Sequence, residues 1–340
     1  MRVVEIARPG GPEVLRFAER AVPVPRDGEV RVRVAAASVN RPDIQQRRGL
    51  YPPPPGTTDI PGLDIAGIVE AVGSGVGEVA VGDAVCALAN GGGYADHCIV
   101  PAVQCMPVPR GLSFIEAASL PEVYFTAWNN VVWLGRLAAG ETLLVQGGTS
   151  GVGMAAIQIA RQLFDARVFA TAGDEQKRGV CRDLGVEAAF DYRGDWDADI
   201  RSHLSGGGVD IILDGQAGPT SQRQLDLLNP DGRLVLVASH QGEHAEINMR
   251  QLVRRRLTVT GSTLRPRPHA YKGRLARELV ARVWPLLEEG RIATRIHAAL
   301  AFEQVREAHE ILDANRQIGK VVLVVEPALA GGVPRPRHPA

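Results

Sequence analysis

The chain has 340 residues, more than one ordinary hydrophobic core holds, so we expect two domains. Apolar residues make up 45% and charged residues 22% of the sequence, which is typical of a globular protein. The formal net charge is zero, which argues against a polyanion as the main partner. No apolar run approaches the roughly 20 residues that cross a bilayer, and the first residues lack the apolar stretch of a signal peptide. We therefore expect a cytoplasmic protein.

The cysteines point to the same compartment. Four are present and none forms a CxxC pair: Cys86, Cys98, Cys105 and Cys181. We expect them to be reduced and mostly buried, because a disulfide framework needs oxidising surroundings and a denser cysteine pattern.

The first hundred residues predict a barrel of short strands. Runs rich in β-branched residues, bounded by Gly, Pro or Asp, cover residues 1–6, 30–39, 65–72 and 94–100. The loop YPPPPG at 51–56 interrupts them. It should be extended and stiff, because each proline fixes its own φ and restricts the residue before it.

From about residue 121 the pattern changes to strands that alternate with helix-length segments. The expected strands are 142–146, 167–171, 210–214 and 233–237. The helices between them run through Gln158, over 177–184 and through 225–228. This alternation predicts an α/β fold in which a parallel sheet is covered by helices on both faces.

The C-terminal part should return to the barrel. After Thr263 we expect a long helix over 274–289, followed by a strand, a helix and a last strand at 321–325. The expected domains are therefore 1–120 with 263–326, and 121–262 between them. A tail rich in Pro and Gly, 327–340, is expected to be disordered.

The sharpest local signal is a glycine turn at 146–153, directly after a buried strand and before an apolar helix. Glycines without Cβ atoms allow a tight turn and let the backbone approach a pyrophosphate, and the helix N-terminus offers N–H groups to it. The candidate cofactor residues here are Gly148, Ser150, Gly151, Val152 and Gly153. The alternative is a turn that serves only the packing of helix on sheet.

The end of the second strand of this unit indicates which dinucleotide binds. NAD-binding folds usually place a carboxylate there to hold the ribose 2′-hydroxyl, but residues 170–173 carry none. Lys177 and Arg178 follow, with Tyr192 beyond the next strand, which suits a 2′-phosphate and hence NADP(H). Asp174 either opposes a phosphate here or caps the helix that starts at Glu175.

Several ordered motifs resemble the medium-chain dehydrogenase/reductase superfamily, and among its branches the NADPH-using quinone oxidoreductases related to zeta-crystallin. Besides the glycine turn, they are VNRPD (39–43), GLYPPPPG (49–56), PGLDIAG (61–67), VGD (81–83), GGGYA (91–95), STLR (262–265) and IGKVVL (318–323).

The resemblance implies a GroES-like barrel domain interrupted by a Rossmann domain, an active site in the cleft between them, and homodimers joined through the edges of the Rossmann sheets. It assigns cofactor contacts to Thr126, to Ser150 through Val152, and to Gly173, Lys177, Tyr192, Leu264, Arg265 and Gln317. It also matches Tyr51 to an active-site tyrosine of this branch.

We expect no metal. Zinc-dependent relatives place a cysteine where Asn40 stands and a GHE segment where Gly62, Leu63 and Asp64 stand, and they carry a lobe of four closely spaced cysteines that this chain lacks. A catalytic zinc needs about three ligands, and Leu63 cannot be one of them.

The resulting hypothesis is a zinc-independent NADPH:quinone oxidoreductase. Asn40 is a candidate amide donor to the carbonyl oxygen, and Tyr51 a donor or a wall on which the acceptor stacks. Asn40 could instead be a left-handed turn residue, and Tyr51 could simply pack on the prolines. Two other functions stay open. One is a reductase of enoyl compounds or 2-alkenals with the same fold. The other is a crystallin-like structural or RNA-binding protein, for which the locally basic run 254–256 (Arg-Arg-Arg) gives slight support.

Overall fold

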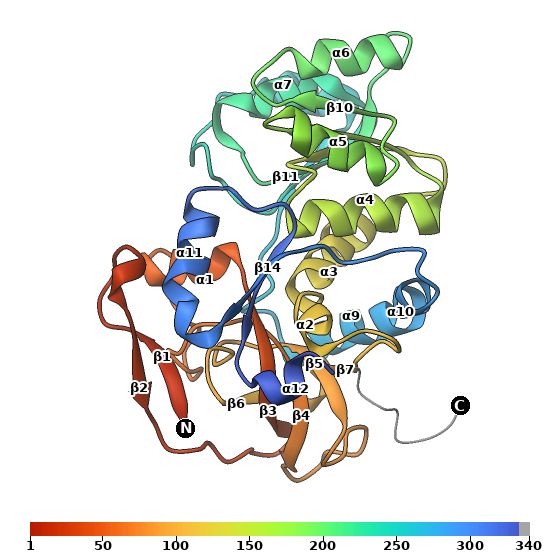
Figure 1. Ribbon diagram of the computed structural model, residues 1–340. Coiled ribbons are helices and arrows are strands. Elements are labelled where there is room, and N and C mark those ends of the chain that lie inside the picture. Colours follow the sequence, from red (N-terminus) through yellow and green to blue (C-terminus); the bar gives the residue numbers. More distant parts are fainter. Residues whose placement is uncertain (333–340) are drawn as a thin grey trace. The chain divides into compact units, whose positions relative to one another are not determined.

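The computed structural model describes residues 1–332, which form two compact units (Figure 1). Unit 1 consists of Met1–Phe125 together with the segment that starts at Arg265, and unit 2 of Thr126–Leu264. Unit 1 is thus made from both ends of the chain, and unit 2 from its middle.

Unit 2 contains a six-stranded sheet in which every pairing is parallel. In spatial order its strands are β10 (Ala188–Asp191), β9 (Arg167–Ala172), β8 (Thr142–Gln146), β11 (Val209–Asp214), β12 (Leu228–Leu236) and β13 (Thr258–Gly261). Leu144, Ile212 and Leu234 from neighbouring strands belong to one buried cluster. The predicted parallel sheet is confirmed.

Helices cover both faces of this sheet. Successive strands move outward from β8 through β9 to β10, and then from β11 through β12 to β13. Because parallel crossovers are right-handed, the helices of the two halves lie on opposite faces. The helices are η3 (Trp128–Leu134, a π-helix), α4 (Gly151–Phe164), α5 (Glu175–Asp183), α6 (Trp196–His203), η4 (Gly218–Thr220), α7 (Ser221–Leu227) and α8 (Met249–Arg255).

Unit 1 is built on a mostly antiparallel sheet. Its strands are, in spatial order, β14 (Ile296–Ala301), β15 (Lys320–Val324), β3 (Glu29–Val39), β4 (Asp64–Val72), β5 (Ala84–Leu88) and β7 (Cys105–Pro107), with β6 (His97–Pro101) paired to β3. A separate hairpin joins β1 (Arg2–Ile6) and β2 (Leu15–Glu19). Because β15 pairs with β3, the C-terminal segment does return to the N-terminal sheet.

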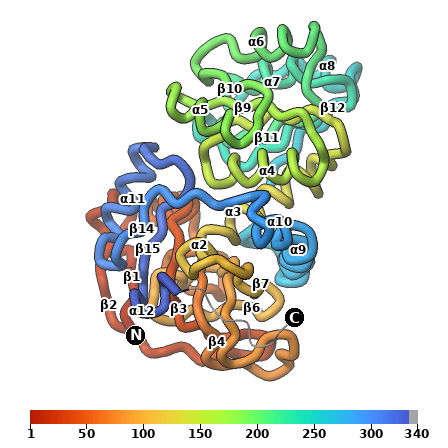
Figure 2. The backbone as a smooth tube through the Cα atoms, turned by 45° about the vertical axis from the view of Figure 1, so that its right-hand side comes forward, coloured from red at the N-terminus to blue at the C-terminus, as the bar shows by residue number. Residues whose placement is uncertain are grey.

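Short helices pack around this sheet (Figure 2). Helix α2 lies against β3, β4 and β15, while α11 lies against β15 and α1. The helices are η1 (Pro12–Val14), α1 (Arg41–Arg47), η2 (Ala102–Gln104), α2 (Phe114–Ala118), α3 (Pro121–Ala127), α9 (His269–Arg282), α10 (Trp284–Glu288), η5 (Phe302–Gln304), α11 (Val305–Asp313) and α12 (Pro327–Ala330). The last two residues of α3 belong to unit 2.

Three expectations need correction. The single helix over 274–289 begins earlier, at His269, and is divided at Val283, because Pro285 has no backbone N–H to continue it. The strand expected at 94–100 begins only at His97. Residues 327–330 form helix α12 rather than a disordered tail, and 333–340 lie outside the described residues.

Two other expectations bear on the compartment. All four cysteines are free, and Cys105 is the one that is not fully buried, so the expected burial is confirmed, while the reduced state stays a prediction. Within the described part of the chain, no helix combines the length and the apolar character needed to span a membrane.

Candidate cofactor and substrate sites

The glycine turn between β8 and α4 is held by very close backbone packing. Gly147 has φ +80°, in the left-handed region that favours glycine. A Cβ on Gly148 would lie 2.7 Å from Sγ of Cys181 and 2.8 Å from Cβ of Ala170. A Cβ on Gly153 would lie 2.4 Å from the carbonyl oxygen of Gly147. The glycines therefore do serve helix–sheet packing, and the same packing draws the turn tight.

Ser150 begins α4 and organises its first turn. Its Oγ accepts a hydrogen bond from the N–H of Gly153 (3.0 Å) and donates one to the carbonyl of Gly147 (2.9 Å). The N–H groups of Gly151 and Val152 precede the first intrahelical hydrogen bond. Because these N–H groups sit at the positive end of the helix dipole, the turn offers an anion a ready place to bind.

The carboxyl end of β9 presents a second feature of a dinucleotide site. The ring of Tyr192 lies so close to Gly173 that a Cβ there would be 3.0 Å from it. The guanidinium of Arg193 lies 5.4 Å from the centre of that ring and donates a hydrogen bond to the carbonyl of Gly173. It also binds Asp191, with Nε and Nη2 at 2.9 and 2.8 Å from the carboxylate oxygens. Hence an aromatic ring and a cation flank Gly173.

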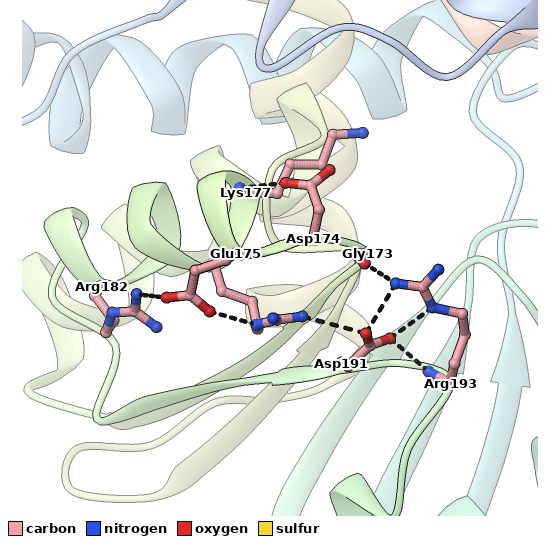
Figure 3. A network of polar contacts seen from close by, with 8 residues as sticks. Gly173, Asp174, Glu175, Lys177, Arg182, Asp191 and Arg193 are labelled. Atoms are coloured by element: carbon pink, nitrogen blue, oxygen red, sulfur yellow. Dashed lines mark hydrogen bonds and ion pairs between the residues drawn. The ribbon is translucent and has the colours of Figure 1, made fainter.

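Asp174 caps the next helix, which is one of the two roles that the sequence suggested for it. Its carboxylate accepts a hydrogen bond from the backbone N–H of Lys177 (2.8 Å) at the start of α5. Figure 3 shows Asp174 and Lys177 at the N-terminal end of α5, with Arg193 joined to Gly173 beside them. The carboxylate thus has a structural partner, while the ammonium of Lys177 lies at the same end of the helix.

The remaining cations of this region belong to a chain of ion pairs (Figure 3). Arg178 joins Glu175 (3.0 Å) to Asp191 (3.3 Å), and Arg182 also pairs with Glu175. The hydrogen bonds from Arg193 hold the pKa of the Asp191 carboxyl well below its usual value. Sequence reasoning named Lys177 and Arg178 but missed Arg193, whose only signal is its position just after the edge strand β10.

In unit 1 a polar cluster surrounds Asn40, which directly follows β3. Asn40 has φ −124° and ψ 160°, so the left-handed turn considered for it is wrong. It caps α1, its backbone N–H donating to Oδ2 of Asp43 (2.8 Å). Its side-chain Nδ2 donates to Asp64 (2.8 Å) and more weakly to Ser38 (3.4 Å), and its Oδ1 accepts from Nζ of Lys320 (2.5 Å).

Asp64 is the centre of this cluster. The fully buried carboxylate accepts hydrogen bonds from Oγ of Ser38 (2.6 Å), from Asn40, and from the backbone N–H of Glu122 (2.6 Å), and it pairs with Nζ of Lys320 at 3.2 Å. Burying a carboxylate is costly unless it is paired and hydrogen-bonded, and here both conditions are met. Sequence reasoning assigned no role to Asp64, Glu122 or Lys320.

Tyr51 lies under a buried arginine. The guanidinium of Arg265 is 5.5 Å from the centre of the Tyr51 ring, and its Nε and Nη2 donate to the carbonyl of Asn90 (3.1 and 2.9 Å). Its buried Nη1 has no hydrogen-bond partner among the described residues. Lys272 donates to Oδ1 of Asn90 (2.5 Å), and burial lowers the pKa of its ammonium to about 8.

Three further residues were predicted to contact the cofactor: Leu264, Gln317 and Thr126. Leu264 is buried, and the partly buried Gln317 keeps an inaccessible Oε1 that no donor in residues 1–332 reaches. The backbone carbonyl of Thr126 accepts from Nδ2 of Asn130 (2.7 Å). Their cofactor contacts stay predictions. In the same described range, no three His, Cys, Asp or Glu side chains gather as a metal site requires.

Two family models match the chain. The alcohol dehydrogenase GroES-like domain matches residues 26–110, which lie in unit 1, and a model described as zinc-binding dehydrogenase matches residues 151–281, mostly in unit 2. The quinone oxidoreductase of Lama guanicoe is 34% identical over 330 residues, a match that covers 96% of this chain and 98% of the relative.

Solved structures with the same fold include proteins with different activities. An NAD-dependent alcohol dehydrogenase (32% identity) has a TM-score of 0.84, and the Escherichia coli quinone oxidoreductase complexed with NADPH (27%) one of 0.85. The JamJ enoyl reductase (25%) also has a TM-score of 0.85. Each match covers 96% of this chain and at least 99% of the other.

Proposed function

Because the chain is an oxidoreductase that belongs to the medium-chain dehydrogenase/reductase superfamily, we propose that it reduces quinones with NADPH and without zinc. The observation that carries the choice of cofactor is the end of β9, where Tyr192, Lys177 and Arg193 gather around a residue without a side chain, Gly173. The NADPH in the similar E. coli quinone oxidoreductase structure supports this choice.

The residues of unit 2 fit a dinucleotide in two places. The N–H groups of Gly151 and Val152 would hold the pyrophosphate, because they precede the first intrahelical hydrogen bond of α4. The N–H of Ser150 donates to the carbonyl of Gly147 (3.1 Å), so the cofactor contact predicted for Ser150 would come from its hydroxyl. Lys177 and Arg193 would bind the 2′-phosphate as charge-assisted donors. When bound, NADPH supplies the hydride for the reaction. In unit 1, Arg265 and Gln317 stay candidate cofactor contacts, since Nη1 of Arg265 and Oε1 of Gln317 have no hydrogen-bond partner among residues 1–332.

Unit 1 supplies groups for a flat carbonyl acceptor. Of the two N–H groups on Nδ2 of Asn40, one is held firmly by Asp64, whereas the contact of 3.4 Å to Ser38 is weak. A carbonyl oxygen can replace Ser38 as the second acceptor. Tyr51 would stack against the acceptor ring, its other face being turned to the guanidinium of Arg265. Alignment of acceptor and hydride donor then supplies most of the rate.

The position of Lys320 supports a reaction that does not use zinc. Its ammonium already occupies the space between Asn40 and Asp64. A divalent ion there would have to displace a buried cation whose two acceptors are both satisfied. Since a quinone anion is spread over a conjugated ring, the reaction does not need a Lewis acid in the way that alkoxide formation does.

Steady-state kinetics with NADPH and NADH across quinones and enones, with metal content measured on the same sample, test the proposal. We expect turnover of quinones with at least tenfold preference for NADPH and no dependence on metal. Turnover that requires stoichiometric zinc would overturn the mechanism, and a preference for NADH would overturn the assignment of Lys177, Tyr192 and Arg193.

A second candidate activity is the reduction of activated C=C bonds, which the likeness to the JamJ enoyl reductase favours. Rates with 2-alkenals far above those with every quinone would establish it.

The RNA-binding alternative loses support from its basic run, because Arg256 pairs with Asp231 and Arg255 donates to the carbonyl of Leu225. The edge strand β13, which ends the sheet of unit 2, supports the predicted homodimer, and a cytoplasmic location stays a prediction.

A further inference from the structure

Lys320 is the buried cation of the polar cluster around Asn40. It opens β15, which pairs with β3 in an antiparallel register that sets Val321 opposite Val39. The same register, continued by one residue, brings Lys320 opposite Asn40. Asp64 opens β4, which pairs with the other edge of β3. Three neighbouring strands thus bring an ammonium, an amide and a carboxylate together at one end of the sheet.

The ammonium sets which way the side-chain amide of Asn40 faces. An ammonium can only donate, so the atom that lies 2.5 Å from it is the oxygen Oδ1 of Asn40. Nδ2 is thereby turned to Asp64, and its second N–H has only the contact of 3.4 Å to Ser38. A flipped amide would set two donors against each other at Lys320 and an oxygen against the carboxylate. Lys320 therefore fixes which group Asn40 offers to an acceptor.

The same ammonium balances a buried negative charge. The carboxylate of Asp64 lies 2.8 Å from Nδ2 of Asn40 and 3.2 Å from Nζ of Lys320. Asp64 is fully buried and Lys320 is 5% exposed, so water screens these charges weakly. In the proposed reaction, hydride transfer leaves negative charge on the acceptor's oxygen at Nδ2. Without Lys320 that charge would develop beside an uncompensated carboxylate, which would raise the barrier.

We propose that Lys320 is the positioning residue of the acceptor site, an inference that rests on the proposed binding of the acceptor's carbonyl by Asn40. It keeps the second N–H of Nδ2 directed at the acceptor, and it cancels the charge of Asp64 beside the oxygen that becomes negative. Lys320 acts through Asn40 and does not itself bind the acceptor. A purely structural lysine would hold β15 against β3 equally well, but its loss would not slow hydride transfer in a variant that stays folded.

A double-mutant cycle of Lys320→Met and Asn40→Ala tests the proposal. The measured quantity is the single-turnover rate of hydride transfer from bound NADPH to 1,4-naphthoquinone. Each single variant should lower this rate about 100-fold, the usual cost of losing a donor to a developing oxygen anion. The double variant should be little slower than either, because Lys320 acts through Asn40, and the Kd of NADPH should stay within about twofold in all three. A double variant slowed by the product of the two single effects overturns the proposal.

Two further variants separate positioning from stability. Lys320→Gln lacks the charge, as Lys320→Met does, but keeps an N–H for Oδ1 of Asn40. It should transfer hydride about tenfold faster than Lys320→Met at an equal free energy of unfolding in urea. Lys320→Met with Asp64→Asn removes both buried charges and should recover stability but not rate. Equal rates in Lys320→Gln and Lys320→Met, or a wild-type rate in the neutral variant, overturn the proposal. A wild type that reduces no quinone or enone overturns the proposed function instead, and this role with it.

Discussion

Two cations, Lys177 and Arg193, and two carboxylates, Asp174 and Asp191, lie around Gly173, and each carboxylate has a defined partner (Figure 3). Asp191 is bound by Arg193, and Asp174 by the backbone of Lys177. A phosphate that enters this region therefore meets carboxylates whose oxygens are already engaged. The side chains of Lys177 and Arg193 can donate hydrogen bonds to the phosphate. The proposed preference for NADPH is therefore compatible with the position of Asp174 beside the site.

Lys177→Gln should weaken NADPH binding about 10-fold, or ~1.4 kcal/mol, because a charge-assisted hydrogen bond to the 2′-phosphate is lost. The Kd of NADH, which has no such phosphate, should stay within twofold. Fluorescence titration of both cofactors measures this. Arg182→Gln is the control, since Arg182 is paired to Glu175. An equal loss for NADH would show that Lys177 binds no phosphate.

Asp174→Asn and Asp174→Ala separate the charge of this residue from its capping role. Asparagine caps a helix about as well as aspartate, so the first variant should keep its stability and bind NADPH roughly threefold more tightly because a nearby negative charge is gone. Alanine should lower the free energy of unfolding by about 1 kcal/mol, because the cap of α5 is lost. Urea unfolding and NADPH titration report both effects. Equal stability of the two variants would contradict the capping role.

At the scale of elements, the turn between β8 and α4 leaves no room for a methyl group. Gly148→Ala would bring a Cβ to 2.7 Å from Sγ of Cys181, so β9 and α5 must shift. We expect a loss of about 1–3 kcal/mol in the free energy of unfolding and weaker NADPH binding. Gly179→Ala, within α5, is the matched control: its Cβ meets Arg182 at 3.8 Å, and alanine should stabilise that helix by ~0.5–1 kcal/mol.

How far the sequence predicted these elements depends on their burial. The strand at 142–146 was predicted with its observed bounds, because it is a continuous apolar run between turn residues. Strands β2, β5, β7 and β13 were missed, since they are short, and β2 also exposes much of its length. Only the part of β12 from residue 233 was predicted as strand, and Leu228 was taken for the end of a helix, because LLNPDG lacks the apolar continuity of a strand.

In the candidate site, the sequence predicted the local features but not the contacts between distant residues. The glycine turn is local, so its spacing alone predicted where it lies. The contact of Lys320 with Asn40 joins residues 280 positions apart, and no spacing rule connects them. One signal was present: Lys320 opens the apolar strand KVVLV, and a lysine that becomes buried requires an acceptor. A buried lysine therefore predicts that an acceptor lies nearby but does not identify which residue provides it.

At the scale of the whole molecule, His309 ties the two chain ends of unit 1 together. This buried residue of α11 contacts Arg47 of α1 (3.2 Å) and the hydroxyl of Tyr94 (3.2 Å). Burial lowers the pKa of its imidazole to about 3, with Arg47 adding to the effect. Because the unfolded chain binds this proton already below pH 6.5, folding stability must fall as the pH drops from 6.5 toward 3.

His309→Gln should therefore lose less stability than the wild type between pH 7 and pH 4.5. We expect the difference between the two proteins to be on the order of 2 kcal/mol, measured by urea unfolding at each pH. Glutamine can still accept from Arg47 and donate to Tyr94. His244→Gln, at an exposed position, is the control and should follow the wild type. A wild type whose stability is level over this range would contradict the prediction.

The position of β15 between β14 and β3 also determines how late in synthesis the sheet of unit 1 can be completed. At roughly 5–20 residues per second, Lys320 leaves the ribosome between about 14 and 56 seconds after Asn40. Throughout that interval Asp64 has no ammonium beside it, and residues 36–39 of β3 lack the partner strand on the edge where β6 pairs only with residues 29–33. Unit 2 is by then fully synthesised. The middle of the chain can thus fold during translation, while the proposed acceptor site is completed only when nearly the whole protein exists.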